Sequence, residues 1–456
     1  MDRSSALEHA KDQVIERASH ASGRAPDGVT EGLGSAAELG SFLRRYYRHV
    51  PPEDVVSRSP DDVLAIALSH ADVAAHRPQG TASIRVSTPE AQGHSIVQVV
   101  CDDMPFLVDS VTAELSRHGR AIHLVVHPLL VVRRDVAGRL LAVCDASSLA
   151  EAGSDGAGTG EWIAESWMRI EIDREPDSEA CAALTADLER VLRDVREAVE
   201  DWPKMRDLAL RIADDVASDP PAGLADLEVS ETTELLRWLA DAHFTFLGCR
   251  EYALSSDGGQ DRLVAVPGTG LGILRADQPQ SSDAGLLPPE VSERAREPQL
   301  VVITKANSRS TVHRPAYLDY VGIKTFDTSG RVVGERRFLG LFTSAAYNES
   351  IQRIPVLRRK AAEALSRSGF SATSHSGKDL LQILETYPRD ELFQISVDDL
   401  EQTGTSVLHL QERRQLRLFL RRDDYGRFMS CMVYLPRDRY TTQVRQVMEA
   451  IFFFYF

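Results

Sequence analysis

The chain has few cysteines, and no two of them lie close together in the sequence. Its five cysteines are scattered over 456 residues, and none falls in a C-x-x-C motif. Zinc ribbons and thioredoxin-type redox centres both need closely spaced cysteines. The sequence therefore excludes these two kinds of site, and we expect reduced, mostly buried thiols at Cys101, Cys144, Cys181, Cys249 and Cys431.

Long apolar runs and an excess of positive charge are also missing. No stretch of about 18 apolar residues occurs, which is the length that a membrane-spanning helix needs. Residues 1–18 lack the apolar segment of a secretory signal. The formal net charge of −16 disfavours phosphate binding by the chain as a whole. We therefore expect a cytoplasmic protein that binds neither membranes nor nucleic acid.

The chain does contain enough apolar residues for several cores. Hydrophobic residues make up 43% of the sequence, and its length corresponds to about three domains. A polar helix is predicted over 1–19 and a second helix over 36–49. A third helical stretch, 52–75, contains Ser59 followed by Pro60, which is a typical N-cap with proline in the first turn. These segments predict a helical lead-in.

Residues 101–134 show a strand, a turn, a helix and a second strand in order. The helix is predicted from Phe106 onward by apolar residues at helical spacing. Asp103 is placed to cap its first N–H groups, Pro105 suits its first turn, and Gly119 suits its end. The run from 121 to 132 is rich in Val and Ile and predicts one strand buried on both faces.

The rest of the chain predicts further strands and helices around a linker at Pro220–Gly223. Before the linker we expect strands at 140–143 and 166–172 and separate helices at 178–200 and 202–219. After it we expect a helix at 230–242 and strands at 245–254, 263–266, 299–305 and within 316–343. Gly268-Thr-Gly270-Leu-Gly272 lacks the spacing and the following helix of a nucleotide-binding loop, so it predicts a glycine-rich turn.

Residues 413–445 hold nine arginines against three aspartates, a net charge of +6, with aromatic residues between them. One interpretation is a local RNA-binding patch. The alternation of apolar residues indicates instead a two-stranded hairpin about Asp424-Tyr425-Gly426, with its arginines in solvent or at a subunit contact.

No pattern of histidines or acids predicts a metal or catalytic site. His123 and His127 would lie about 13 Å apart on one strand, too far to share an ion. His243 and His313 are expected to be structural, and Ser374-His375 reads as a helix entry without the partners that a catalytic serine needs. We therefore predict no catalytic residue, no cofactor and no metal within this chain.

The D-x-P turn at 103–105 resembles the opening of an ACT domain, a small βαββαβ module that binds amino acids. The resemblance extends through five longer blocks and covers about residues 30–448. Together they resemble the N-terminal region of the large NAD-specific glutamate dehydrogenases of bacteria. The blocks are DDMPFLVDSV at 102–111, WLADAHFTFLGCREY at 238–252, FLGLFTSAAYNES at 338–350, SGFSATSHSGKDLLQILETYPRDELF at 368–393 and LRLFLRRDDYGRFMSCMVYLPRDRYTT at 416–442.

The resemblance implies an α+β chain with ACT-like and PAS-like modules. It also implies oxidative deamination of L-glutamate to 2-oxoglutarate with NAD, by a catalytic domain downstream of residue 456. That domain, a second copy of the chain and an amino-acid effector are the implied partners. Five aromatic residues at 452–456 favour a truncated chain over a membrane anchor. The implied layout is a helical segment at 1–83, ACT-like domain 1 at 84–219, a PAS-like domain at 220–346, a linking helix at 347–373 and an incomplete ACT-like domain 2 at 374–456.

Two turns are predicted as effector sites. At the first, formed by Asp102, Asp103, Pro105 and Phe106, the N-terminus of the following helix would attract a carboxylate. In ligand-binding ACT domains a glycine usually follows the proline, so Phe106 favours the alternative of a structural or oligomer-forming module. The second turn offers the arginine pair Arg437 and Arg439. The alternative to a dehydrogenase part is a free-standing amino-acid sensor.

Overall fold

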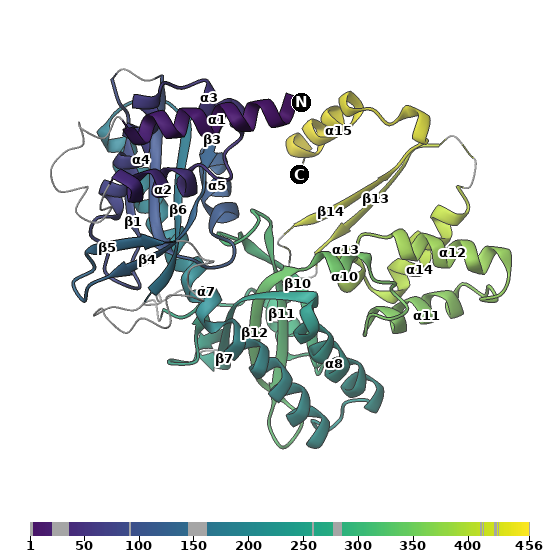
Figure 1. The fold of residues 1–456 in the computed structure, drawn as a ribbon. Helices are drawn as coiled ribbons and strands as arrows, with labels where there is room; N and C mark the ends of the chain where they lie inside the picture. Colours follow the sequence, from purple (N-terminus) through teal and green to yellow (C-terminus); the bar gives the residue numbers. More distant parts are fainter. Residues whose placement is uncertain are drawn as a thin grey trace. The chain divides into compact units, whose positions relative to one another are not determined.

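A computed structural model of the chain forms two compact units (Figure 1). Unit 1 comprises residues 1–199 and 311–315, and unit 2 comprises 200–310 and 316–456. The predicted division into five segments is finer than this and stays a prediction. The structure describes residues 3–20, 36–90, 93–144, 162–257, 260–276, 285–410, 413, 415–423, 426 and 428–455.

Unit 1 begins with α1 (Arg3–His20), α2 (Ala36–Tyr46), α3 (Pro52–Val56) and α4 (Pro60–Ala74). The first two correspond to the predicted helices, and the predicted stretch 52–75 is divided into α3 and α4. The expected cap of α4 is confirmed, since the Ser59 side chain accepts a hydrogen bond from the Asp62 N–H. Apolar faces of these helices share a core cluster with Trp167 of the first sheet. They cover one face of that sheet (Figure 1).

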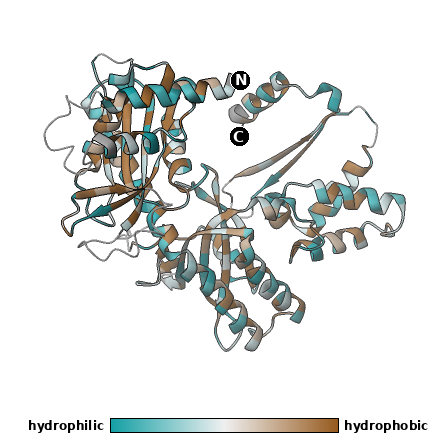
Figure 2. Cartoon of the chain, viewed as in Figure 1, coloured by the Kyte–Doolittle hydropathy of each residue, from teal (hydrophilic) through white to brown (hydrophobic). Residues whose placement is uncertain are grey.

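The sheet of unit 1 is antiparallel in every pairing between its strands, and its strands are mostly hydrophobic (Figure 2). Its order is β1-β2-β6-β4-β5, and β3 also pairs with β6. The predicted strand 121–132 is wrong in two respects. It is interrupted at His127-Pro128, and it is not buried on both faces, because His123 and Leu129 are exposed. Residues 124–126 and 129–133 keep one register on β6, Ile122 is shifted from it, and Pro128 has no N–H to give to the ladder. The strands are β1 (Ser83–Ser87), β2 (His94–Asp102), β3 (Ile122–Val126), β4 (Leu129–Arg134), β5 (Leu140–Cys144) and β6 (Trp162–Asp173).

Two helices between residues 101 and 219 differ from expectation. In α5 (Leu107–Arg117) the N-cap residue is Phe106 and no side chain caps the helix, so the predicted capping by Asp103 is wrong. Gly119 adopts the expected left-handed conformation after the helix end, with φ 74°. The two helices predicted at 178–200 and 202–219 are one continuous helix, α7 (Ser178–Ser218), with Pro203 inside it. Buried apolar residues on both sides of Pro203, such as Ala198 and Met205, hold the helix together by packing.

Unit 2 contains a second antiparallel sheet in the order β10-β11-β12-β7-β8, and β9 pairs with β7. Phe244, Phe246, Phe338 and Phe342 pack edge to face in its core. Its elements are α8 (Asp226–Trp238), the π-helix η3 (Leu239–His243), β7 (Phe244–Asp257), β8 (Gln260–Ala265), β9 (Leu271–Gly272), α9 (Pro289–Arg296), β10 (Val301–Arg309), β11 (Tyr317–Phe326), β12 (Val332–Phe342), α10 (Ser344–Asn348), α11 (Leu357–Arg367), α12 (His375–Thr386), α13 (Arg389–Gln394) and α14 (Val397–Leu408).

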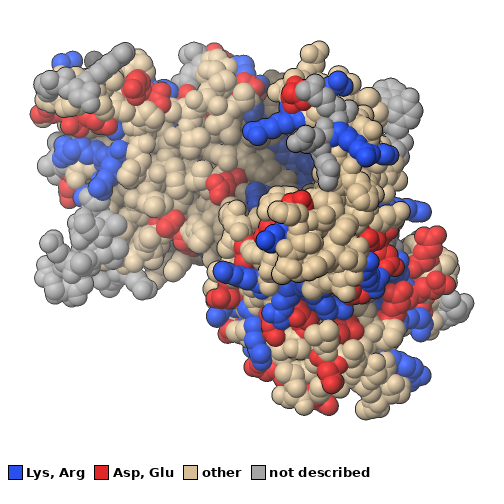
Figure 3. Space-filling view, turned by 90° about the vertical axis from the view of Figure 1, so that its right-hand side faces the viewer, with Lys and Arg blue, Asp and Glu red and all other residues tan. Residues whose placement is uncertain are grey.

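The two strands of the predicted C-terminal hairpin are confirmed, whereas Asp424 and Tyr425 of its predicted turn lie outside the described residues. Strands β13 (Arg417–Arg422) and β14 (Met429–Tyr434) pair antiparallel, and the 3-10 turn η4 (Arg437–Arg439) and helix α15 (Thr442–Tyr455) follow. Basic and acidic side chains are interspersed over the lower part of the face shown in Figure 3. Among the described helices, none has both the length and the hydropathy of a membrane span.

The buried carboxylate of Glu165 joins several elements of unit 1. It is fully buried and accepts hydrogen bonds from Arg77 Nε (3.0 Å), Arg134 Nε (2.6 Å) and Trp167 Nε1 (2.9 Å). Arg134 Nη1 also donates to the carbonyls of Ala74 and Gly138, both at 2.8 Å. This network connects the end of α4, the β4–β5 turn and strand β6.

A second buried carboxylate, Asp319 on β11, lies in the core of unit 2. It accepts hydrogen bonds from Lys305 Nζ (2.5 Å) and from the Phe342 N–H (3.0 Å). Burial raises the pKa of Asp319 to about 6, and the nearby charge of Asp390 adds to that, although Lys305 acts in the opposite direction. The folded state therefore binds the proton of Asp319 more tightly than the unfolded chain does.

Replacing Glu165 by Gln is expected to destabilise unit 1 by about 3–5 kcal/mol, because the buried Arg134 guanidinium loses its counter-charge and the buried Arg77 guanidinium keeps only that of Asp102. Urea unfolding followed by tryptophan fluorescence, to which Trp162 and Trp167 of unit 1 contribute, measures this. Glu179→Gln, at an exposed position in the first turn of α7, serves as the control and should change the unfolding free energy by less than about 0.5 kcal/mol. Equal stability of the two variants would contradict the proposed role of the network.

Asp319 should make unit 2 lose stability as the pH rises. Its folded pKa of about 6 exceeds the ordinary value of 3.8, so its contribution is complete below the unfolded pKa and is lost as the pH passes the folded one. The difference in unfolding free energy between wild type and Asp319→Asn should shift by about 3 kcal/mol in favour of the variant between low and neutral pH. Denaturant melts across that range test this, and a difference independent of pH would contradict it.

Candidate functional site

The first predicted effector turn follows β2 in unit 1. Its first residue, Asp102, is held by two arginines. Arg77 Nη2 donates to Oδ1 at 2.7 Å and Arg196 Nη2 donates to Oδ2 at 2.8 Å. Burial by itself would raise the pKa of Asp102, but the hydrogen bonds and charges of these arginines lower it below its ordinary value. Asp102 is therefore an ionised acceptor that orients Arg196.

The other residues of this turn face a different environment. Asp103 and Pro105 are exposed, whereas Phe106 is half-buried. Phe106 has a left-handed backbone with φ 73°, a conformation that costs an L-residue about 1–2 kcal/mol and costs glycine nothing. The position where ligand-binding ACT domains usually carry glycine therefore has a glycine-like backbone here, with a phenyl ring added to it.

Residues 311–315 lie against this helix start. The His313 N–H donates to Ser110 Oγ at 2.9 Å, and the His313 ring lies 5.0 Å from the Phe106 ring. His313 Nδ1 is 3.3 Å from Asp109 Oδ2, and Thr311 Oγ1 donates to Asp194 Oδ2 at 2.7 Å. The chain itself thus occupies the place where the sequence predicts a ligand.

A cavity of about 240 Å³ lies beside the same turn. Buried apolar side chains and the Cys101 thiol line it, and burial raises the pKa of that thiol to about 12. Charged side chains of α7 complete the lining. The lining residues are Gly80, Thr81, Ala82, Cys101, Met104, Leu107, Glu189, Leu192, Arg193 and Arg196.

The second predicted turn lies in unit 2. Arg437 and Arg439 are exposed within η4, which connects β14 to α15. No described cavity includes these two side chains. Their role in effector binding stays a prediction.

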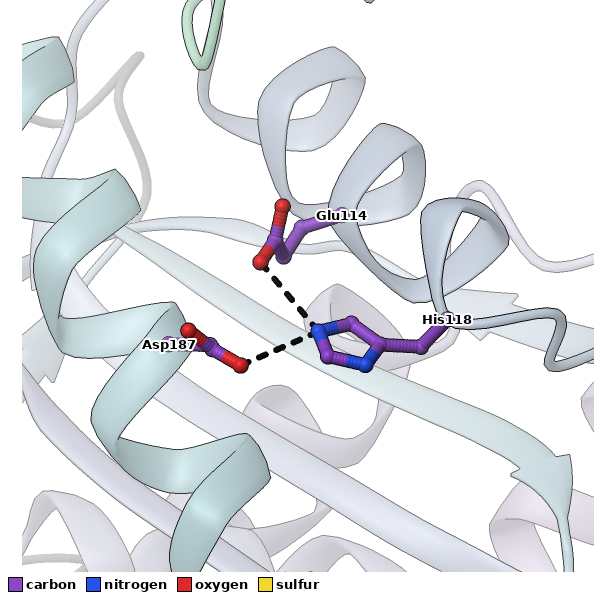
Figure 4. Close-up of side chains that lie close together, drawn as sticks. All are labelled: Glu114, His118 and Asp187. Atoms are coloured by element: carbon purple, nitrogen blue, oxygen red, sulfur yellow. Dashed lines mark ion pairs between the residues drawn. The ribbon is translucent and has the colours of Figure 1, made fainter.

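Glu114, His118 and Asp187 converge between α5 and α7 (Figure 4). His118 Nε2 is 3.4 Å from Glu114 Oε1 and 3.0 Å from Asp187 Oδ2. The Arg117 guanidinium donates to both oxygens of Glu114, and Arg190 donates to Glu114 and to Asp187. Because these arginines already neutralise the carboxylates, the cluster is better suited to hold α5 against α7 than to bind a cation.

The remaining motifs lie where the sequence places them. His123 bonds to Asp173 and His127 to Ser166, so the two histidines have separate partners. His243 bonds to the Trp238 carbonyl. The expected glycine-rich turn at 268–272 is met only in part, because Leu271 and Gly272 form strand β9 on β7. Gly268 and Gly272 both have positive φ. The Ser374 side chain caps α12 by accepting from the Gly377 N–H.

Sequence reasoning missed Arg193, Arg196 and Glu189. They lie on one long helix whose pattern reads as an ordinary solvated face. Their spacing of three and four residues places them together on that face. Only the packing of α7 beside the turn after β2 brings them to a cavity.

Three family models match the chain. Residues 42–188 match the glutamate dehydrogenase ACT1 domain, 354–413 match its helical motif 1, and 417–456 match its ACT2 domain. An NAD-specific glutamate dehydrogenase of Halomonas elongata is 39% identical over 90% of this chain. Those of Pseudomonas aeruginosa and Mycobacterium tuberculosis are 36% and 32% identical over 93% and 86% of it.

The chain spans about a quarter of the length of these relatives, from 23% to 26%. The resemblance found in the sequence blocks is thereby confirmed, and the matched models lie in the order ACT1, helical motif 1, ACT2 along the chain. The chain belongs to the family of NAD-specific glutamate dehydrogenases, and it carries the ACT1, helical-motif and ACT2 regions of that family.

Proposed function

We propose that these residues are the regulatory and assembly part of an NAD-dependent glutamate dehydrogenase. The enzyme would convert L-glutamate, NAD and water to 2-oxoglutarate, ammonia and NADH, with the reacting groups and the NAD site outside residues 1–456. The observation that carries the proposal is the 39% identity with an NAD-specific glutamate dehydrogenase along 90% of this chain. The chain would act in the cytoplasm as part of a homo-oligomer.

The layout of the regulatory part follows from the same family. Unit 1 would contribute the first ACT module, and the sheet of unit 2 would be the PAS-like module. The hairpin β13–β14 with α15 would belong to the second ACT module, as the match at 417–456 supports. An effector or module docking would then bias the catalytic domain by about 1–3 kcal/mol without supplying a reacting group.

A free-standing amino-acid sensor is the second candidate. The cavity beside the turn after β2 favours it, because a small-molecule site in the ACT unit would serve either protein. The two candidates differ in whether glutamate oxidation depends on this chain.

NADH formation from L-glutamate and NAD should distinguish them. We expect no activity from the 456-residue chain, and activity from a chain of the relatives' length that begins with it, because the reacting groups are proposed to lie downstream. Absorbance of NADH measures both. Activity of the short chain would place the chemistry within residues 1–456, and silence of both chains would favour the sensor.

A further inference from the structure

His123 is the extra residue of a β-bulge in unit 1. Its two neighbours in β3 pair with consecutive residues of β6, Ile172 and Glu171, so His123 itself has no partner in that ladder. A bulge bends its strand and re-aims a side chain, and bulges are common beside functional sites. Here the bulged side chain reaches the end of β6, where His123 Nε2 lies 2.9 Å from Asp173 Oδ1.

A second histidine joins this pair from the other edge of β6. His94 of β2 lies directly opposite Asp173 in the register of the two strands, and residues in that relation point to the same face of a sheet. The ring centroids of His94 and His123 are 4.2 Å apart. Two imidazoles and one carboxylate, contributed by three strands, therefore lie together at one end of the first sheet.

One ring nitrogen of His94 has no partner in the part of the chain that the structure describes. His94 is half-buried, and its Nδ1 atom is shielded from solvent without a hydrogen bond to any described residue. A buried polar atom in that state is costly and calls for an explanation such as a bound ion. The nitrogen of a neutral imidazole is a common metal ligand.

The carboxylate of Asp173 is free of arginines. It accepts hydrogen bonds from the Ala121 N–H and from His123, both at 2.9 Å, and no described arginine bonds to it. Glu114 and Asp187 differ in this respect, because arginines bond to both of them. The side chains of His123 and Asp173 are 37% and 51% exposed, so an ion can reach them from solvent.

The separation of the His123 and Asp173 ligand atoms is close to that of a zinc site. Bonds of about 2.0–2.2 Å in a tetrahedral set put two ligand atoms about 3.4 Å apart, so the present 2.9 Å has to widen only slightly. The His94 ring has to turn as well. Among the described residues, three ligand atoms already lie within 4.8 Å of one another only in the cluster of Glu114, His118 and Asp187.

We propose that His94, His123 and Asp173 bind one Zn²⁺ ion, with water as the fourth ligand. Two imidazoles and a carboxylate are a ligand set that Zn²⁺ takes in proteins, and three protein ligands leave one position open. The ion replaces the hydrogen bond between His123 and Asp173 and joins the ends of β2, β3 and β6. This site is independent of the regulatory role proposed above, because it needs only unit 1.

Calorimetric titration with ZnCl₂ tests the proposal, with the 456-residue chain free of any histidine tag and treated first with a chelator. We expect one site, and His123→Gln and Asp173→Asn should each weaken it more than about tenfold, since even loss of an outer-shell partner costs about that much. His375→Gln is the matched control. His375 is exposed at the start of α12, and its replacement should leave the affinity within about twofold.

Thermal unfolding supplies a second measurement. Zn²⁺ should raise the unfolding temperature of the wild type and of His375→Gln, but not that of His123→Gln, because only a bound ion stabilises the folded state. Since His123 and Asp173 are exposed, all variants should unfold at the same temperature as the wild type in the presence of the chelator.

His118→Gln tests the competing location between α5 and α7. We expect it to bind Zn²⁺ like the wild type. Loss of binding in His118→Gln with none in His123→Gln would move the ion to the cluster of Glu114, His118 and Asp187 and overturn the proposal. Equal effects of the His118, His123 and His375 variants would show only scattered surface binding and would also overturn it, as would the absence of any Zn²⁺ binding by the wild type.

Discussion

The fold of unit 1 depends on a single buried carboxylate. Glu165 is fully buried in the middle of the sheet and faces Arg77 and Arg134. A charge in that position is tolerated only with partners of opposite sign and complete hydrogen bonding. Both conditions are met here, and the partners come from the residues after α4 and from β4. The relative positions of these elements are thereby tied to one another.

The same network extends to the surface turn. Arg77 bonds to both Glu165 and Asp102, and Asp102 bonds to Arg196 of α7. The chain of charges thus runs from the sheet interior to the edge of the cavity. The Gly138 carbonyl belongs to this network. Only glycine fits at this position, because an added Cβ would lie 2.6 Å from the Arg77 backbone. A ligand at Arg196 would therefore contact an element that the core already holds rigid.

The elements with strong local signals could be predicted from the sequence. Ser59 with Pro60, the apolar spacing after Phe106 and the alternation in 417–434 each specify their element by neighbouring residues alone. The errors came where tertiary contacts outweighed local preference. Pro203 would end an isolated helix, but buried neighbours keep α7 continuous. Aspartate is a typical N-cap residue, yet Phe106 and not Asp103 is the N-cap residue of α5.

The sequence by itself determined the family, the mixed helix and strand content, and the place of the turn after β2, because motifs and periodicity are local properties of the chain. The tertiary structure decided what surrounds that turn. Residues 311–315 come from about 200 positions away to cover the helix start, and Arg193 and Arg196 reach the cavity through the packing of α7. Contacts between residues so distant in sequence leave no periodic or spacing signal, so only the folded chain shows them.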